Sequence, residues 1–393
     1  MTKMAKQDKN IKNFPNLRFP GFQEDWEVKN LKEVCVIGRG KSKHRPRDAE
    51  FLFGGKYPFI QTGDVRRADL YLSEFTQTYS EAGLKQSKLW DENTLCITIA
   101  ANIAETAILK IKACFPDSVI GLIPKENKTL VLFVKHLFDK FKIEIQKLSQ
   151  GAAQDNLNQE KLSKIKFAFP SIVEQIKISS FLSIIDERIA TQKKIISHLE
   201  TSIRSYREKI FSQKLRFKDK LGNNFADWKD SKLENICQKQ SSNISANKIE
   251  ENFGSYTIYG ASGILKKVDF YEEENEFVSI VKDGAGVGRL FFCEAKSSVL
   301  GTMDIIKPKP DVNIYFLFYQ LSNIDFTKYV TGSTIPHIYF RDYKKEKLKI
   351  PSNHEQTKIA NFLFSIDEKI ETEKKILKQY ENQKKHLLTN LFV

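Results

Sequence analysis

Basic side chains gather in one short segment of this sequence, in a pattern suited to binding a polyanion. Lys41, Lys43, His44, Arg45 and Arg47 all fall between positions 41 and 47. Lysine and arginine can each bind a phosphate group through charge-assisted hydrogen bonds. We therefore interpret Lys41, Lys43 and Arg45 as phosphate-binding residues, and a solvated basic loop is the alternative.

A second set of polar side chains follows short apolar runs, where turns are expected. Such groups can hydrogen-bond to base edges in a DNA groove, and an ordinary role in a turn is the alternative for each of them. The set comprises Gln61, Thr62, Asp64 and Asn102 in the first half of the chain, and Tyr259, Ser262, Lys282 and Asp283 in the second.

Two loops are stronger candidates as a pair, because each precedes a long helical pattern at the same place. The first spans 150–156 and the second 332–337. The polar residues we single out are Gln154 and Asn156 in the first loop, and Ser333, Thr334 and His337 in the second. We expect these loops to contact DNA.

The segment KDGAGVGR at 282–289 superficially resembles a phosphate-binding loop. No Gly-Lys-Ser/Thr follows it and no βαβ pattern surrounds it, so a tight turn between strands is the better interpretation. Lys282 and Arg289 beside the glycines can still face phosphate. The sequence has no adenine-methylation motif of the NPPY or DPPY type, no Walker sequence and no HExxH spacing. We expect a protein without catalytic residues, metal ligands or a cofactor of its own.

Composition narrows the class of protein. A chain of 393 residues exceeds one ordinary core, so two or more domains are expected. The net charge of +14 favours nucleic acid or an anionic membrane surface as partner, and a lysine-rich solvated surface is the alternative. No apolar run reaches the length of a membrane span, and the N-terminus has no signal-peptide core. Five cysteines without a CxxC indicate reduced thiols, so we expect a cytoplasmic protein.

The chain repeats itself. PSIVEQIKISSFLSIIDERIATQKKIISHLE at 170–200 and PSNHEQTKIANFLFSIDEKIETEKKILKQYE at 351–381 are identical at about half their positions. The segments before the two copies are less alike, although both open with Leu-Arg-Phe, at 17–19 and 215–217. SVIG at 118–121 also matches SVLG at 298–301. Strand-like runs, turns and one apolar helical stretch in each half predict two pseudo-repeated α+β units.

Each repeat carries apolar residues at alternating steps of four and three, which is a heptad seam. Two seams in one chain most simply pack on each other. An antiparallel pair would return the second helix to the first unit, so that both chain termini lie at one end. The predicted parts are a basic tail at 1–15, globular units at 16–169 and 214–350, and helices at 170–213 and 351–393, which together give an α+β protein with a long antiparallel two-helix coiled coil.

Two like helices can bind two copies of one partner, and two unlike units can read two different DNA segments. The residues we expect on the exposed docking faces are Glu174, Gln175, Asp186 and Glu187 on the first helix, and Glu355, Gln356, Asp367 and Glu368 on the second.

The whole chain from about residue 16 resembles the specificity subunits of type I restriction–modification systems. The resemblance lies in the paired PxxxEQxKI…FL…IDE(R/K)I helices, in GSTIPH at 332–337, and in YPFI…TGD at 57–64. QGAAQDN at 150–156 departs from the GSTIP pattern, which places the contacts of the first loop in doubt.

The resemblance implies two target-recognition domains that read a split, asymmetric DNA site. It also implies that the helices space those domains and dock two modification (methyltransferase) subunits, with two restriction subunits outside. S-adenosylmethionine, ATP and Mg²⁺ would then belong to the partners. A coiled-coil scaffold without DNA binding is one alternative, and a fused methyltransferase, which the absent catalytic motif opposes, is the other.

Overall fold

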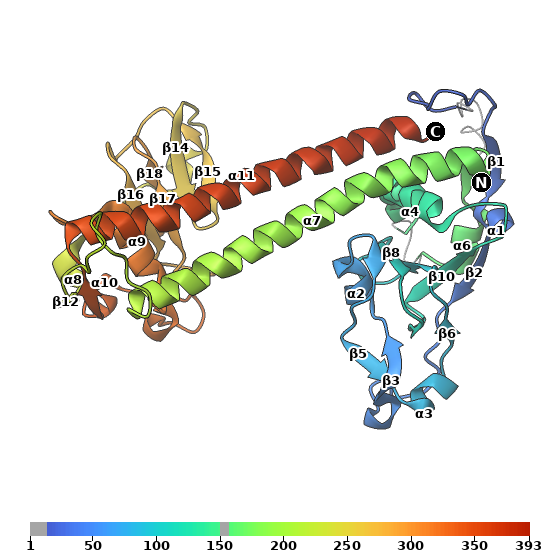
Figure 1. The fold of residues 1–393 in the computed structure, drawn as a ribbon, viewed down its shortest axis with the longest axis horizontal. Helices are drawn as coiled ribbons and strands as arrows, with labels where there is room; N and C mark the ends of the chain where they lie inside the picture. The colour runs from blue at the N-terminus through green and yellow to red at the C-terminus, as the bar shows by residue number, and fades with distance from the viewer. Residues whose placement is uncertain (1–13, 150–156) are drawn as a thin grey trace. The chain divides into compact units, whose positions relative to one another are not determined.

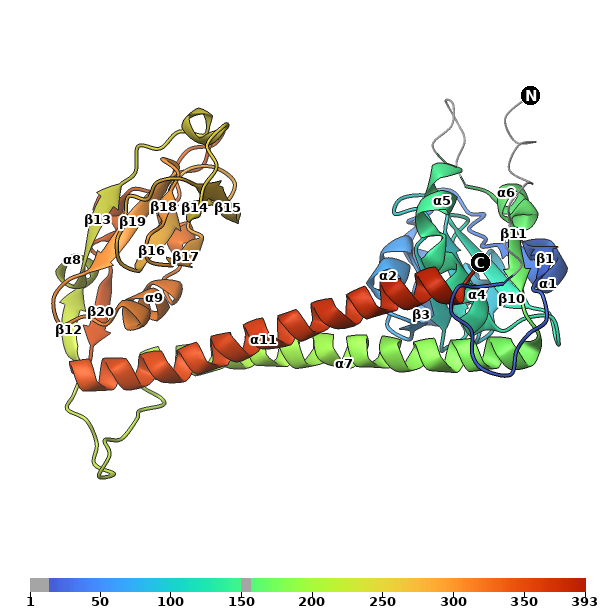
Figure 2. The same ribbon diagram turned by 90° about the horizontal axis from the view of Figure 1, so that it is seen from above.

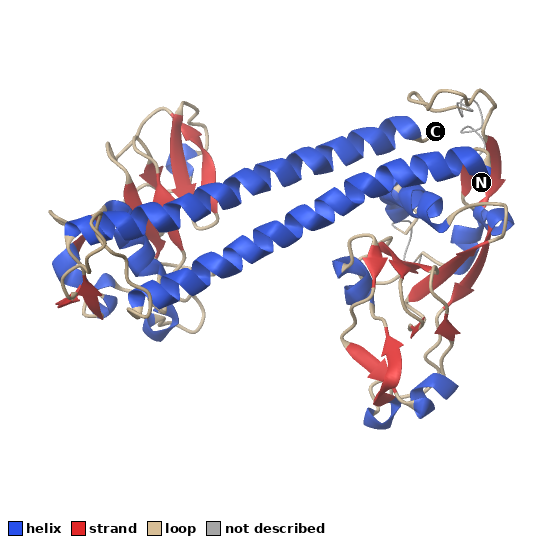
Figure 3. Cartoon of the chain, viewed as in Figure 1, coloured by secondary structure: helices blue, strands red, loops and turns tan. Residues whose placement is uncertain are grey.

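The computed structural model describes residues 14–149 and 157–393. The chain divides into two compact units. Unit 1 contains the chain up to Lys194 together with Lys375–Val393, and unit 2 contains Ile195–Lys374. Two long helices, α7 (Ile172–Phe211) and α11 (Asn353–Leu391), each contribute one part to unit 1 and one part to unit 2 (Figures 1 and 3). All remaining helices and strands belong to one unit only.

Unit 1 contains two sheets and a two-stranded ribbon. The five-stranded sheet has the order β2 (Cys35–Arg39), β10 (Val119–Pro124), β7 (Leu95–Thr98), β8 (Thr106–Leu109) and β4 (Tyr71–Leu72). The four-stranded sheet has the order β5 (Gln77–Tyr79), β3 (Phe53–Phe59), β9 (Ala113–Cys114) and β6 (Leu89–Trp90). The ribbon pairs β1 (Glu27–Asn30) with β11 (Lys166–Phe169).

Unit 2 repeats this plan with fewer strands. Its four-stranded sheet has the order β13 (Cys237–Ser241), β19 (Met303–Pro308), β16 (Phe277–Val281) and β17 (Leu290–Cys293). Its three-stranded sheet has the order β15 (Gly263–Val268), β14 (Tyr256–Gly260) and β18 (Ser298–Val299), and β12 (Lys229–Lys232) pairs with β20 (Lys347–Ile350). Helix α9 (Ile314–Ser322) packs against β16 and β17 (Figure 2).

The strand pairing shows that the two units share one scaffold. Strand β3 pairs antiparallel with β5 and parallel with β9, and β14 pairs in the same two ways with β15 and β18. The central strands β7 and β16 are buried along their whole length. Burial along both faces explains why their sequences, LCIT and FVSIV, do not alternate between apolar and polar residues and contain only one small polar residue each, Thr98 and Ser279. The prediction of two pseudo-repeated α+β units is therefore confirmed.

The sequence match of SVIG with SVLG does not join equivalent strands of the two units. SVIG at 118–121 leads into β10, whereas SVLG at 298–301 covers β18, and the structural counterpart of β18 in unit 1 is β9. Four-residue apolar runs fit any buried strand, so the local match did not identify the correct strand.

The helix pairing is antiparallel in each unit. In unit 1 the first half of α7 packs against the last turns of α11, where Ile185 and Ile189 join Leu387 and Leu388 in one core cluster. In unit 2 the last turns of α7 meet the start of α11, and Ile210 packs with Leu363 and its neighbours. These contacts confirm that the predicted apolar stripes of the two helices pack on each other near both ends of the pair.

Both chain termini belong to unit 1, as an antiparallel pair requires. The Leu17 backbone N–H donates to the Asn390 carbonyl oxygen at 2.9 Å. The predicted return of the second helix to the first unit is therefore confirmed.

Candidate nucleic-acid interface and helix anchors

Three loops of unit 2 meet at one edge of its sheets. The loop at 282–289 connects β16 with β17. Within it, the Gly288 N–H donates to the Val281 carbonyl at 2.8 Å, so the glycine-rich segment is the tight turn that the sequence predicted. Gly284 and Gly288 have φ of 90° and 83°, a backbone conformation that favours glycine. This turn is the segment to which the other two loops of the candidate interface are hydrogen-bonded.

Hydrogen bonds join the other two loops to that turn. Arg289 Nη1 donates to the Ala261 carbonyl at 2.9 Å, which connects the turn with the β14–β15 hairpin. The Gly284 N–H donates to the Pro336 carbonyl at 2.9 Å, which connects it with the loop at 331–338. Thr331 and His337 exchange two backbone hydrogen bonds of 2.8 Å, so the third loop is itself a closed turn.

The structure therefore brings together most of the polar residues that the sequence singled out in unit 2. Ser262, Arg289, Ser333 and Thr334 are exposed, and His337 is half-buried. Lys282 is also half-buried, and its Nζ lies 3.3 Å from the buried carboxylate of Asp304.

Tyr259 does not fit the prediction of a solvent-facing side chain. Its ring is 7% exposed and packs in a core cluster, and its hydroxyl accepts a hydrogen bond from the Glu294 N–H at 3.3 Å. Burial raises the pKa of Tyr259 to about 12. The expectation of an exposed Tyr259 side chain was wrong, because tyrosine after an apolar run is as well suited to a core as to a turn.

Unit 1 has a different structure at the same place. Where unit 2 turns into a hairpin, the chain after β3 enters the short helix α2 (Thr62–Arg67). Gln61 and Thr62 are half-buried at its start, and Gln61 Nε2 donates to Gln77 Oε1 at 2.6 Å. Arg66 Nη1 donates to Asn102 Oδ1 at 2.9 Å, so the β7–β8 turn joins this helix. Gln61, Thr62 and Asn102 thus lie in one neighbourhood.

Asp64 has a structural role in that neighbourhood. It is 3% exposed, accepts a hydrogen bond from the Gln61 N–H at 2.8 Å, and pairs with Arg67. A buried carboxylate that caps a helix and neutralises an arginine is not available to a base edge. The expectation of a free, exposed Asp64 carboxylate was therefore wrong.

The basic loop at 41–47 presents its cations to solvent. Lys41, Lys43 and Arg45 are exposed, and Arg45 Nη1 donates to the Ser42 carbonyl of its own loop at 2.7 Å. Arg47 instead forms an ion pair with Asp117 at 2.7 Å. The loop is thus held in place with three cations facing outward. Gln154 and Asn156 lie outside the described residues.

The Glu-Gln pairs of the two helices are buried, which contradicts their predicted exposure. Glu174 and Glu355 are 1% and 0% exposed. Each accepts two hydrogen bonds from one arginine, Arg18 at 2.8 and 2.8 Å and Arg216 at 2.9 and 3.1 Å. Each arginine belongs to the Leu-Arg-Phe segment that precedes the first strand of its unit. The glutamate therefore anchors that segment to the long helix.

Gln175 and Gln356 anchor a second segment in the same way. Gln175 accepts from Thr129 Oγ1 at 2.9 Å and donates to the Pro170 carbonyl at 2.9 Å. Gln356 accepts from the Asn313 N–H at 3.0 Å and donates to the Pro351 carbonyl at 3.1 Å. Thr129 and Asn313 lie just before α4 (Val131–Lys140) and α9. Gln175 therefore binds the segment just before α4, and Gln356 binds the segment just before α9.

The next acidic pair is also engaged inside the chain. Asp186 is 8% exposed and contacts His136 Nε2 at 2.9 Å and Lys384 Nζ at 2.7 Å. Lys384 also contacts Asp139 at 2.9 Å, so one cation of α11 joins α7 to α4. Burial would raise the pKa of Asp186, but His136 and Lys384 outweigh it and hold that pKa below its usual value.

Unit 2 places Asp367 in the corresponding position. Its Oδ2 accepts a hydrogen bond from the Tyr319 hydroxyl at 2.6 Å, and burial raises the pKa of its carboxyl. Of the eight acidic and amide residues predicted for docking, only Glu187 and Glu368 are exposed. The other six mainly hold the helices to their units.

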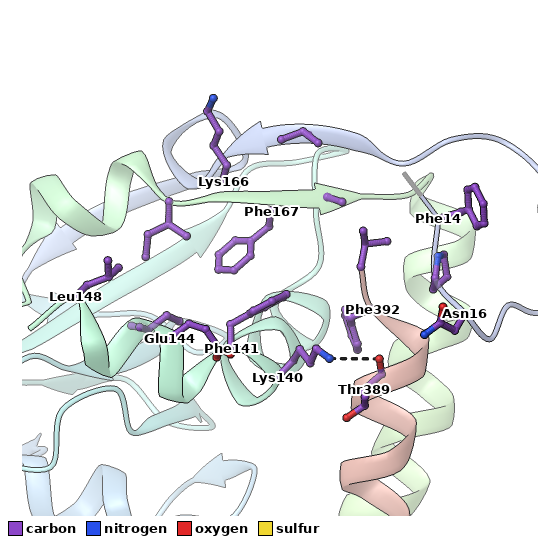
Figure 4. Close-up of a pocket in the computed structure, with 16 residues that line it drawn as sticks. Phe14, Asn16, Lys140, Phe141, Glu144, Leu148, Lys166, Phe167, Thr389 and Phe392 are labelled. Atoms are coloured by element: carbon purple, nitrogen blue, oxygen red, sulfur yellow. Dashed lines mark hydrogen bonds between the residues drawn. The ribbon is translucent and has the colours of Figure 1, made fainter. Parts of the chain in front are cut away.

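The hollow drawn in Figure 4 is separate from these groups. It has a volume of about 720 Å³ and lies in unit 1 between Phe141, Phe167 and Phe392. Lys140 Nζ donates across its edge to the Thr389 carbonyl at 3.2 Å. Its lining contains none of the predicted DNA-binding or docking residues.

Three further features concern metal ligands, membrane spans and cysteines. Among residues 14–149 and 157–393, no group of three or more histidine, cysteine or acidic side chains could hold a metal ion. In the same ranges, no helix combines the length and apolarity that crossing a bilayer requires. All five cysteines are buried free thiols.

Sequence reasoning missed several residues at these sites. Arg66, Tyr339 and Arg341 are exposed beside the predicted residues, and Arg341 lies over the Tyr339 ring at 4.6 Å. It also missed the partners of the glutamates. A signal was present, because Leu-Arg-Phe and Glu-Gln recur together in both halves and carry opposite charges.

Comparison with known proteins covers both halves of the chain. Residues 23–201 and 226–382 each match the model of the type I restriction modification DNA specificity domain. The type I restriction enzyme MjaVIII specificity subunit of Methanocaldococcus jannaschii is 24% identical over 422 residues, which cover 98% of this chain and 95% of the relative.

Solved structures support the fold. The S subunit of a type I restriction-modification system from M. genitalium has a TM-score of 0.66 at 18% identity, with 97% of this chain and 99% of that chain covered. A chain from a structure that describes complex assembly and conformational transition of the type I R-M system has a TM-score of 0.51 at 12% identity, with 95% and 98% covered.

Proposed function

This chain belongs to the type I restriction-modification DNA specificity family, and we propose that it reads a DNA target made of two different half-sites, one through each unit. As a specificity subunit it contributes sequence recognition and is not the enzyme of its complex. The observation that carries the proposal is one scaffold with two different edges. The strands that the two units share keep the same order, but unit 1 places α2 where unit 2 places a hairpin.

A common scaffold with different loops fits a reader of two sequences. Loops on a rigid framework can change their contacts while the core stays the same. In unit 1 the reading residues would be Gln61, Thr62 and Asn102, with Lys41, Lys43 and Arg45 on phosphates. In unit 2 they would be Ser262, Ser333, Thr334 and His337, with Lys282 and Arg289 on phosphates.

The helices would carry the partners. Glu187 and Glu368 occupy equivalent positions of the two repeats and are exposed, so each could contact one copy of the same modification subunit. Restriction subunits would join through those copies. S-adenosylmethionine, ATP and Mg²⁺ would act on the partner subunits, and the specificity chain would position them.

Exchange of one unit tests the two-reader model. Residues 16–169 are replaced by the corresponding unit of another family member, and the methylated motif of the host is sequenced with the parent and with the hybrid chain. We expect one half of the motif to change and the other to stay. A motif that changes in both halves, or in neither, contradicts the model.

The scaffold alternative makes a different prediction. A coiled-coil adaptor without DNA binding would leave the host methylome unchanged when the chain is deleted. It would also fail to shift duplex DNA in a gel. Loss of the methylated motif on deletion, together with a gel shift by the purified chain, would exclude it.

A further inference from the structure

Exposed apolar side chains gather on the same unit 2 loops that carry the polar candidates. Ile264 is 69% exposed at the β14–β15 hairpin, and its neighbour Leu265 is also exposed. Ile335 is 61% exposed in the loop at 331–338, and Tyr339, directly after this loop, is also exposed. Large apolar groups in water have an unfavourable hydration free energy, so their concentration at one edge indicates a surface that becomes covered.

These side chains are held on a fixed support. The hairpin turn is connected to the 282–289 loop by Arg289, and a Cβ on Gly286 would lie only 3.2 Å from the Ala261 carbonyl oxygen. The loop with Ile335 is connected to the same turn through Gly284 and Pro336. Ile264 and Ile335 therefore belong to two segments that are both hydrogen-bonded to the 282–289 turn, one through the Arg289 side chain and one through backbone groups, so ordering them on binding has a small entropic cost.

The charge around these loops indicates what covers them. Lys267 and Arg289 are exposed on or beside the hairpin, and Arg341 is exposed next to Tyr339. Lys282 is half-buried, its carbonyl oxygen accepts from the Ile338 N–H at 2.9 Å, and its Nζ lies 3.3 Å from Asp304. Cations that surround an apolar patch suit a ligand with an anionic backbone and apolar groups set between its charges. Duplex DNA has this pattern, because phosphates border grooves in which thymine displays a methyl group.

The major groove limits the choice of contact. Among the base edges exposed there, the C5-methyl of thymine is the apolar group, and the other groups donate or accept hydrogen bonds. Resting on the proposed function, we propose that Ile264 and Ile335 contact thymine methyl groups in the half-site read by unit 2, and so determine specificity for A·T pairs.

Unit 1 offers a contrast at the equivalent place. The hairpin is replaced there by α2, whose exposed side chains are Arg66, hydrogen-bonded to Asn102, and Arg67, paired with Asp64. A guanidinium is suited to the acceptors of guanine, whereas isoleucine is suited to a methyl group. The thymine preference therefore belongs to unit 2 and is not a property of the shared scaffold.

Uracil in place of thymine removes the methyl group and leaves base pairing intact, which gives a direct test. The full-length chain is titrated with a duplex that carries the host's methylated motif, with thymine or deoxyuridine in the unit 2 half-site. Burying one methyl group changes affinity about fourfold. We expect binding to weaken about fourfold for each thymine contacted. Ile264→Ala and Ile335→Ala should each lose only the part of this response that comes from the thymine the substituted residue contacts.

Matched controls separate this effect from folding and from general binding. Leu221→Ala removes a side chain that is 87% exposed in unit 2 but lies outside these loops, and it should keep the full response to uracil. Deoxyuridine in the unit 1 half-site should affect the parent chain and Ile264→Ala equally. All three substituted side chains are exposed, so the variants are expected to fold.

The outcomes are distinguishable. Equal affinity of the parent chain for thymine and deoxyuridine duplexes overturns the methyl contact, as does a unit 2 half-site without A·T pairs. Ile264→Ala and Ile335→Ala variants that remain fully sensitive to uracil also overturn it. A chain that does not distinguish its motif from a scrambled duplex contradicts the proposed function itself, and the methyl contact with it.

Discussion

The substitution Glu355→Gln tests whether the Glu-Gln motif holds the scaffold together or binds a partner. Glu355 is fully buried and accepts three hydrogen bonds, from Arg216 Nε at 2.9 Å, Arg216 Nη2 at 3.1 Å and Trp228 Nε1 at 3.0 Å. Glutamine keeps the shape and one acceptor oxygen, but it removes the charge and turns a donor toward the guanidinium.

The expected cost follows from this geometry. Removing one partner of a buried ion pair costs about 3–5 kcal/mol. The Arg216 side chain is 25% exposed and can regain part of its hydration, which favours the lower end. We therefore expect the unfolding free energy of unit 2 to fall by about 3 kcal/mol, which makes full opening of that unit roughly a hundredfold more frequent.

Amide hydrogen exchange measured by mass spectrometry can resolve the two units. The buried strand β16 reports the opening of unit 2, and β7 reports the opening of unit 1. Glu355→Gln should accelerate exchange in β16 and spare β7, whereas Glu174→Gln should do the reverse. The exposed Glu368→Gln should leave both strands unchanged. Unchanged exchange in β16, combined with lost binding of a modification subunit, would refute the anchoring role.

Two further predictions follow from buried groups. Burial lowers the pKa of His136 from its ordinary 6.5, so below that pH the unfolded chain binds a proton that the folded chain does not. As the pH decreases below 6.5, the unfolding free energy of unit 1 should then decrease by about 1.4 kcal/mol per pH unit, until His136 is protonated in the folded chain as well. In denaturation experiments between about pH 5 and 8, the His136→Gln variant should not show this dependence of the unfolding free energy on pH. The pKa values of Asp139 and Asp186 are also lowered, so these two groups would decrease the unfolding free energy further only at pH values near and below 4. In a second comparison, Trp228→Phe should lose about 1 kcal/mol more hydrogen-bond stabilisation than Trp26→Phe, because Trp228 donates to Glu355 and Trp26 Nε1 has no hydrogen-bond partner among the described residues. Denaturant unfolding of both variants measures the two losses of unfolding free energy, and equal hydrogen-bond contributions would contradict this comparison.

Local patterns predicted the architecture well. The heptad steps identified both long helices, because a buried stripe on a helix recurs every three or four residues whatever the rest of the chain does. The repeated order of strand-like runs indicated two related units. The excess of lysine and arginine indicated a polyanionic partner, since charge is a sum over residues and needs no coordinates.

Individual side-chain roles were predicted less well. Tyr259 and Asp64 were expected at base edges, but one ring is buried in a core cluster and one carboxylate caps a helix. Residue type did not distinguish these roles, because tyrosine and aspartate are equally suited to both. Burial, which decides between them, depends on neighbours that are distant in sequence.

By itself, the sequence determined that two like helices follow two α+β units in a strongly basic chain, because periodicity, repetition and net charge are local or additive properties. Only the tertiary structure decided that Arg18 meets Glu174 and Arg216 meets Glu355, pairs separated by 156 and 139 positions. It also decided that three loops of unit 2 share one edge, with Ile264 and Ile335 exposed among cations. Contacts of this kind arise when the chain closes on itself, and the identity of the contacting residues is then set by the fold.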